Sequence, residues 1–270
     1  MLQYLDYLPS LLIGMARIYP CAFLVAAFCF QHIRGMPRHA IVAVLALLPA
    51  PGIYATFADQ ELSTLMLSAL VLKEAALGTL LGVLLSMPFW MFEAVGALLD
   101  NQRGALAGGQ LNPSLGPDAT PIGHLFKELA IFLLMSTLGL GALTQVIWDS
   151  YSVWPPTVWF PLPHANGFGV FLNLLGDTFT HMMLYAAPFI AVLLLLEFGV
   201  ALLGLYSPQL QVSTLAPPVK CLAGIGILLL YFELLQDLIV GRLSLLGELK
   251  HALGPVSYTH LRAHETEADL

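Results

Sequence analysis

Charged residues are scarce in this sequence. Only 10% of the 270 residues are Asp, Glu, Lys or Arg, whereas 58% are hydrophobic. Soluble domains carry about 25% charged residues, and a domain of this size cannot bury so large an apolar share, because burial saturates as chains lengthen. The scarcity excludes a soluble protein and predicts an integral membrane protein.

Basic residues and cysteines are also few. The chain has 10 Lys and Arg against 17 Asp and Glu, a net charge of -7, and its basic residues are scattered singly. This distribution excludes a nucleic-acid partner. Cys21, Cys29 and Cys221 lie in or beside apolar runs and form no CxxC pair, so we interpret them as small apolar residues and expect no metal or cofactor.

Motifs of the common enzyme classes are missing. The sequence has no GxSxG elbow, no Walker A loop and no GxGxxG opening a helix. His264 and Glu265 are adjacent, but no HExxH follows from them. We therefore expect a protein that is not an enzyme, and an intramembrane hydrolase has no support.

Long apolar runs make up most of what is present. With about 20 residues per membrane crossing, they predict about six spans, at about 8–30, 40–57, 64–99, 124–147, 173–206 and 219–240. The third and fifth runs exceed one straight crossing and contain Pro88 and Pro188, which predict bent helices or tight hairpins. The expected fold is an all-α, polytopic membrane protein of about six long kinked helices or hairpins.

Loop charges and tryptophans predict an orientation. The more basic set of loops includes 31–39 and 100–123, which favours these loops as cytoplasmic and the N-terminus as external. Trp148, Trp154 and Trp159 would then lie outside. Their amphipathic rings predict an anchor in the headgroup layer.

Several charged residues interrupt the apolar runs: Lys73, Glu74, Glu93, Asp100, Glu197 and Glu233. Each would cost about 2.5–3.5 kcal/mol at mid-membrane, so each should face a partner or a wet cavity. A proton or ion relay in a transporter and structural contacts with other subunits both fit. Asp100 and Arg103, at i,i+3, could also pair with Glu93 nearby as a self-satisfied helix end.

Glycine and proline gather in one polar stretch. "RGALAGGQLNPSLGPDATPIG", residues 103–123, holds five glycines and three prolines between two apolar runs. An ordinary solvated connector explains it as well as a functional loop does. Gly78 and Gly82 have GxxxG spacing within an apolar run, where small residues permit close helix packing, although chance explains the spacing too.

An ordered set of sequence blocks resembles a known family. The blocks are "RGMPRHAI", "KEAALGTLLG", "FEAVGALLDNQRGA", "DSYSVWP" and "APFIAVLLLLEFGVALLGLYSPQLQVSTLAPPVK". Their order and spacing resemble the export-apparatus T subunit of type III secretion systems, the SctT/FliR-like export-gate family. The resemblance covers about residues 1–250, and the D-x-Q-R-G and P-Q-L…P-x-K blocks are the most specific.

The resemblance implies a place in a larger assembly. It implies one inner-membrane export-gate domain over residues 1–254, with an R-like part at about 1–170 and an S-like helical hairpin at about 171–254. The implied partners are R-like and S-like gate subunits, a U-like switch subunit, a large V-like subunit, unfolded secreted proteins and the lipid membrane. The polar tail 255–270 has no counterpart, and we interpret it as vector-derived or mis-sequenced.

The resemblance also assigns roles to residues. It implies that 104–121 is a plug in the export channel, anchored and shaped by the following residues: Asp100, Gln102, Arg103, Gly104, Gly108, Gly109, Asn112 and Pro113. Contacts with neighbouring subunits would use a set of charged side chains: Lys73, Glu74, Glu93, Glu197 and Lys220. Met87 and Met91 could form a soft seal around the passing chain, with core packing as their alternative role.

One other function remains open. A secondary transporter for a small solute or ion would also use broken helices and buried carboxylates. It predicts activity of the isolated chain, whereas a gate subunit predicts inactivity without its partners. No two halves of the sequence mirror one another, which favours the gate.

Overall fold

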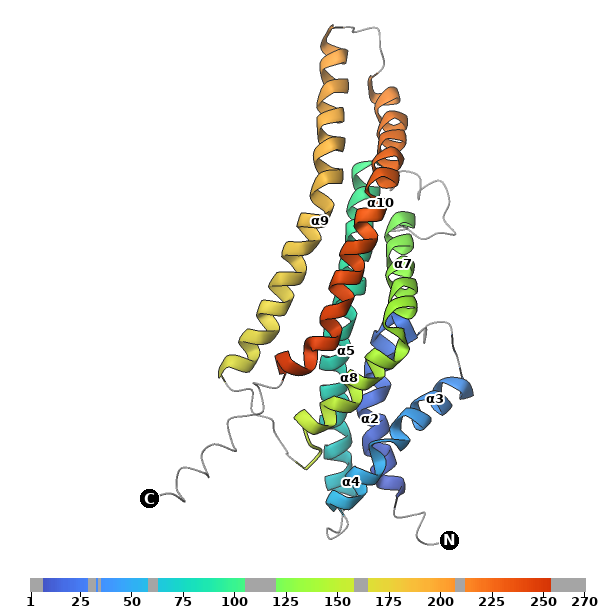
Figure 1. The fold of residues 1–270 in the computed structure, drawn as a ribbon, viewed down its shortest axis with the longest axis vertical. Helices are drawn as coiled ribbons and strands as arrows, with labels where there is room; N and C mark the ends of the chain where they lie inside the picture. Colours follow the sequence, from blue (N-terminus) through green and yellow to red (C-terminus); the bar gives the residue numbers. More distant parts are fainter. Residues whose placement is uncertain are drawn as a thin grey trace. The chain divides into compact units, whose positions relative to one another are not determined.

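The computed structural model describes residues 7–28, 33, 35–57, 63–104, 120–157, 165–206 and 212–253. Every regular element in these ranges is helical, which confirms the all-α prediction (Figure 1). The elements are α2 (Leu8–Leu24), the 3-10 helix η1 (Ala26–Phe28), α3 (Met36–Leu47), α4 (Ala50–Phe57), α5 (Thr64–Gln102), α7 (Pro121–Thr137), α8 (Gly139–Val153), α9 (Ala165–Tyr206) and α10 (Val212–Leu253).

Several of these helices can cross a membrane. Within the described ranges, three segments are long and apolar enough to do so alone: Thr64–Gln102, Leu172–Tyr206 and Ala216–Ser244. The pairs α3 with α4 and α7 with α8 raise this number to five if each pair counts as one broken span. The multi-span prediction is confirmed, and the count of six stays a prediction.

Prolines do not interrupt the two longest predicted runs. Pro88 lies inside the 39-residue α5, and Pro188 lies inside the 42-residue α9. The tight hairpin that we considered for each run is therefore wrong. A single proline removes one helical hydrogen bond, and in an apolar setting the other backbone groups are satisfied only by continuing the helix.

The described helices contribute to two compact units. The first consists of Met1–Met87, Leu138–Asn173 and Leu243–Leu270, and the second of Pro88–Thr137 and Leu174–Arg242. Helix α5 contributes residues 64–87 to the first unit and the remainder to the second. Both units are discontinuous in sequence. The predicted boundary at about residue 170 separates an R-like part from an S-like part. It was drawn from resemblance to other subunits and not from compactness, so it stays a proposal.

Close contact between α2 and α5 shapes the first unit. A Cβ added at Gly78 would lie 2.0 Å from the carbonyl oxygen of Arg17, and one at Gly82 would lie 2.9 Å from Cα of Cys21. Only glycine permits this approach, which confirms the close helix packing predicted from the GxxxG spacing. Ile13 and Leu70 continue the contact as buried core residues.

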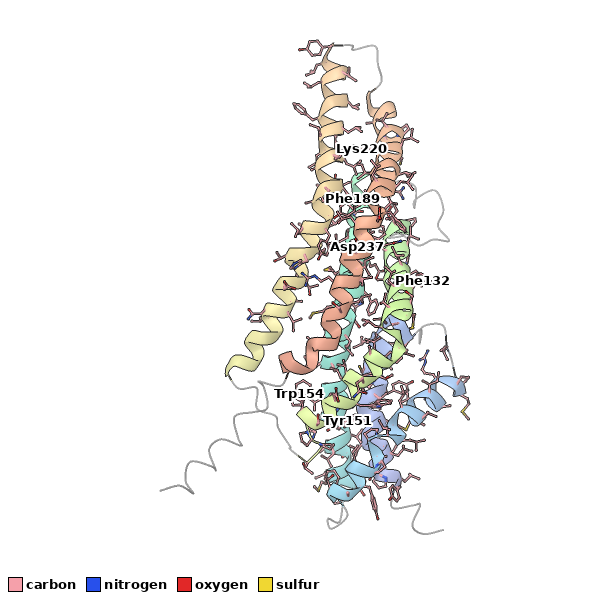
Figure 2. All side chains as sticks on the ribbon, viewed as in Figure 1. Phe132, Tyr151, Trp154, Phe189, Lys220 and Asp237 are labelled. Atoms are coloured by element: carbon pink, nitrogen blue, oxygen red, sulfur yellow. The ribbon has the colours of Figure 1, made fainter. Side chains whose placement is uncertain are left out.

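The second unit joins the end of α5 to α7 and to the α9–α10 hairpin. A Cβ at Gly96 of α5 would lie 2.6 Å from the carbonyl oxygen of Ile122, so α7 also packs closely on α5. Between α9 and α10, the rings of Phe189 and Tyr231 meet edge to face with centroids 4.8 Å apart. The apolar side chains along both helices are drawn in Figure 2, where Phe189 and Lys220 are labelled.

Candidate functional site

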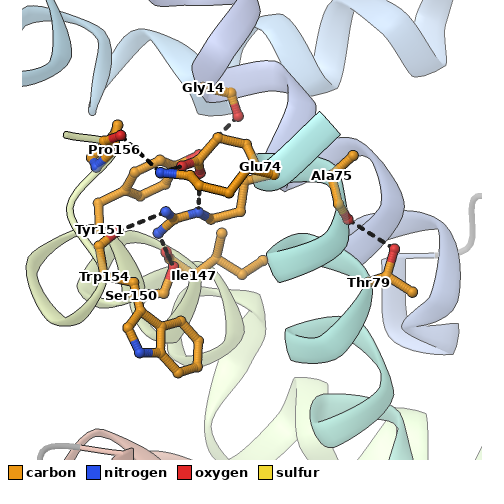
Figure 3. A network of polar contacts seen from close by, with 11 residues as sticks. Gly14, Glu74, Ala75, Thr79, Ile147, Ser150, Tyr151, Trp154 and Pro156 are labelled. Carbon is orange, nitrogen blue, oxygen red and sulfur yellow. Dashed lines mark hydrogen bonds and ion pairs between the residues drawn. The ribbon is translucent and has the colours of Figure 1, made fainter. Parts of the chain in front are cut away.

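A buried arginine organises the polar core of the first unit. Arg17 of α2 is 0% exposed and donates from Nε to Oε2 of Glu74 at 2.6 Å. Its Nη1 donates to Oγ of Ser150 at 3.1 Å, and its Nη2 donates to the carbonyl of Trp154 at 2.7 Å. Figure 3 shows these contacts converging from separate helices. One guanidinium thus joins α2, α5 and the end of α8.

Lys73 completes this network. Its Nζ lies 2.9 Å from Oε1 of Glu74 and donates to the carbonyl of Pro156 at 2.8 Å. Two cations therefore share one carboxylate, and the excess positive charge meets carbonyl oxygens just beyond the end of α8. The C-terminal end of a helix carries partial negative charge, so this placement is favourable. The Tyr151 ring lies 4.1 Å from the Arg17 guanidinium and adds a cation–π contact.

This network differs in three respects from what the sequence predicted. Lys73 and Glu74 have partners inside the chain, and their contacts with neighbouring subunits stay a prediction. The sequence reasoning missed Arg17 as a site residue, although a lone arginine in an apolar run demands an acidic partner. The headgroup anchor is wrong for Trp154, whose side chain is 7% exposed and packs inside the chain.

A second buried carboxylate ties together two helix ends in the second unit. Asp100 is 0% exposed, and its Oδ1 accepts from Nε and Nη2 of Arg103 at 2.8 and 2.6 Å. Its Oδ2 accepts from the backbone N–H of Ile122 at 2.8 Å and of Gly123 at 3.4 Å. These N–H groups belong to the first turn of α7, where no intrahelical acceptor exists. Asp100 therefore holds the residues on both sides of 105–119.

Gly104 lies two residues beyond Gln102, the last residue of α5. Its φ of 80° is left-handed, a conformation that glycine adopts at little cost, and its N–H donates to the carbonyl of Asn101 at 3.1 Å. Gln102 is half-buried at the last position of α5. The remaining predicted plug residues, Gly108, Gly109, Asn112 and Pro113, lie outside the described residues. Their roles stay predictions, as does the anchoring role of Gln102.

The predicted pairing of Asp100 with Arg103 is confirmed, but Glu93 does not join it. Glu93 instead accepts from Nζ of Lys127 on α7 at 2.7 Å. Across the hairpin, Nζ of Lys220 lies 2.7 Å from Oε2 of Glu197. These predicted contact charges thus have partners inside the chain, and contact with other subunits stays untested.

The α9–α10 hairpin carries a further polar tie that the sequence reasoning missed. Arg242 of α10 donates to Asp177 at 2.7 Å and to the hydroxyl of Tyr185 at 3.1 Å, both on α9. No local spacing signals these pairs, because the residues lie 65 and 57 positions apart. Together with Lys220 and Glu197, they fix the register of the two helices.

Met87 and Met91 of α5 are 4% and 3% exposed. Burial of this kind fits the core-packing role, and the seal around a passing chain stays a prediction. Within the ranges that the structure describes, no group of three or more His, Cys, Asp or Glu side chains could hold a metal ion. The polar groups described here are paired with each other, an arrangement that holds helices in place.

Known proteins resemble this chain over most of its length. Residues 8–246 match the sequence model of the bacterial export proteins, family 1. Yop proteins translocation protein T of Yersinia pestis is 32% identical over 219 residues, which cover 80% of this chain and 83% of the relative. Surface presentation of antigens protein SpaR of Salmonella typhimurium is 32% identical over 224 residues, 83% of each chain.

A flagellar protein is a more distant relative. Flagellar biosynthetic protein FliR of Caulobacter vibrioides is 24% identical over 200 residues, which cover 74% of this chain and 79% of the relative. The matched region contains α2, α5, α7 and α8, the helices whose residues form the buried networks around Arg17 and Asp100. The chain therefore belongs to family 1 of the bacterial export proteins.

Proposed function

We propose that this chain is a non-enzymatic component of the inner-membrane export gate of a type III protein secretion system. Unfolded substrates would pass through the channel that it helps to form, with energy supplied by other components. Its family membership and its several apolar helices support this function. The higher identity to the Yersinia and Salmonella proteins than to the flagellar relative favours a virulence-type system.

The observation that carries the proposal further is the double contact of Asp100. Its carboxylate binds Arg103 on one side of residues 105–119 and the first turn of α7 on the other. Such a contact fixes both ends of the intervening segment at one point. We assign 104–121 as the channel plug, with Asp100, Arg103 and Gly104 at its fixed base.

The partner assignments complete the proposal. Residues 1–170 form the R-like part and 171–254 the S-like hairpin, and they assemble with R-like, S-like, U-like and V-like subunits. In support, α9 and α10 form one long hairpin with its own polar ties. The export-gate function is better supported than the transporter alternative, because the relatives are export proteins.

The plug assignment is tested by loosening its base. Asp100→Asn keeps the size of the side chain but removes the charge that binds Arg103 and the α7 amides. In cells with the assembled system, we expect resting leak of small solutes to rise several-fold and secretion to fall. Glu128→Gln on α7, at an exposed position, is the matched control. If leak and secretion were unchanged in Asp100→Asn and in Arg103→Ala, these residues would not hold the base of a plug.

A further inference from the structure

Helix α10 presents two carboxylates on its exposed side. Glu233 and Asp237 are both exposed, and they are separated by one helical turn. Exposed positions recur every three or four residues along the same face, at Leu222, Gly226 and Leu229. The opposite face is buried within the chain, with Leu235 and Ile239 at 0% exposure. Figure 2 labels Asp237 on α10.

These carboxylates lie in a segment apolar enough to cross a membrane. The span Ala216–Ser244 has a mean hydropathy of 1.8 in its most apolar window, and only 17% of that window is buried inside the chain. Glu233 and Asp237 both lie within this span. Lipid is an unfavourable neighbour for a charged carboxylate in such a segment.

No partner within the described residues neutralises the two groups. The ion pairs that α10 forms there involve Lys220 and Arg242, and none involves Glu233 or Asp237. The neighbouring side chains are apolar and exposed, with Leu229 at 73% and Leu230 at 88% exposure. The face thus combines an apolar surface for helix packing with two negative charges that require a cation.

We propose that this face, defined by Leu222, Leu229, Leu230, Glu233 and Asp237, docks a membrane-spanning helix of another export component that carries Lys or Arg. Basic residues one turn apart on that helix would pair with both carboxylates while its apolar side chains cover the leucines. The inference rests on the proposed function, because it takes the partner from the same apparatus. It differs from that function in assigning the surface and its chemistry.

Charge reversal tests the docking face. The full chain is co-expressed with the other membrane proteins of its apparatus, and the complex is purified in mild detergent. Because both side chains are exposed, the Glu233→Lys/Asp237→Lys variant should still fold, as helical content and a single size-exclusion peak of the isolated chain would report. We expect at least tenfold less complex, whereas Glu128→Lys on α7 should assemble normally. Normal assembly of the double variant would overturn the proposal.

Photo-crosslinking identifies the occupant independently of folding. A photoreactive residue in place of Leu230 should form an adduct with a peptide from a membrane helix that contains Lys or Arg. Replacing those basic residues by Glu should restore assembly of the reversed variant. Adducts with lipid alone, or rapid labelling of Glu233→Cys by a membrane-impermeant maleimide in the complex, would overturn the proposal. If the unaltered chain recovers no other component, the proposed function itself fails.

Discussion

At the scale of single residues, buried charge is tolerated here because each group has several partners. Arg17 and Glu74 are both wholly buried, and their side chains meet at 2.6 Å. Removing one member of a buried pair costs about 3–5 kcal/mol when the other is left without a counter-charge, and here Lys73 would still pair with Glu74 if Arg17 were removed. The network therefore contributes most to stability when it is complete.

Arg17→Met tests the network. It keeps a long side chain but removes every hydrogen bond that links Glu74, Ser150 and Trp154. We expect the free energy of unfolding in detergent to fall by about 1–3 kcal/mol, because the polar partners of Arg17 lose their hydrogen bonds while Lys73 still pairs with Glu74. Arg17→Lys should recover little of it, because an ammonium cannot reproduce the guanidinium fork.

Replacing both charges provides the control for Arg17→Met. In Arg17→Met/Glu74→Leu, no buried carboxylate is left behind, so the loss should be smaller than the sum of the two single losses. Additive losses would show that Arg17 and Glu74 act independently, contrary to the 2.6 Å ion pair.

The sequence could predict local pairs but not distant ones. Asp100 and Arg103 were foreseen because i,i+3 spacing places both on one helix face. Glu93 lies on the same helix, yet it binds Lys127, 34 positions away, because α7 packs beside it. Arg17 and Glu74 lie 57 positions apart. Only tertiary packing decides which distant charges meet, so these pairs could not be derived from spacing.

At the scale of elements, close helix contact depends on glycine. Gly78 and Gly82 let the backbone of α2 approach α5 directly. The GxxxG spacing made this packing predictable, whereas the continuity of α5 through Pro88 was not predictable. The sequence signals that proline weakens a helix, but the continuity of α5 depends on the helices that surround it.

Gly78→Ala tests the contact between α2 and α5. Its added methyl would lie 2.0 Å from the carbonyl oxygen of Arg17, and a backbone atom cannot move aside cheaply. We expect a loss of about 1–3 kcal/mol or more in unfolding free energy. Gly226→Ala on α10 is the matched control, because its Cβ would have no neighbour within 4 Å. Equal stability of the two variants would contradict the packing described for α5.

At the scale of the whole molecule, large apolar surfaces are left uncovered by the chain itself. Only 17% of the most apolar window is buried in each of Leu172–Tyr206 and Ala216–Ser244, compared with 56% in Thr64–Gln102. Lipid can cover leucines on these surfaces, but exposed acids such as Glu233 need protein or water. The composition predicted a membrane protein, and the exposed apolar surface agrees with membership of a family of bacterial export proteins.

The central claim is that this chain acts only as one part of an export gate, and the mass and composition of its native complex test it most directly. Tagged residues 1–254 would be co-expressed with the other membrane components and measured by native mass spectrometry. The account predicts a defined complex of this chain with the R-like and S-like gate subunits. A lone monomer or homodimer, formed although those partners are present, would contradict it.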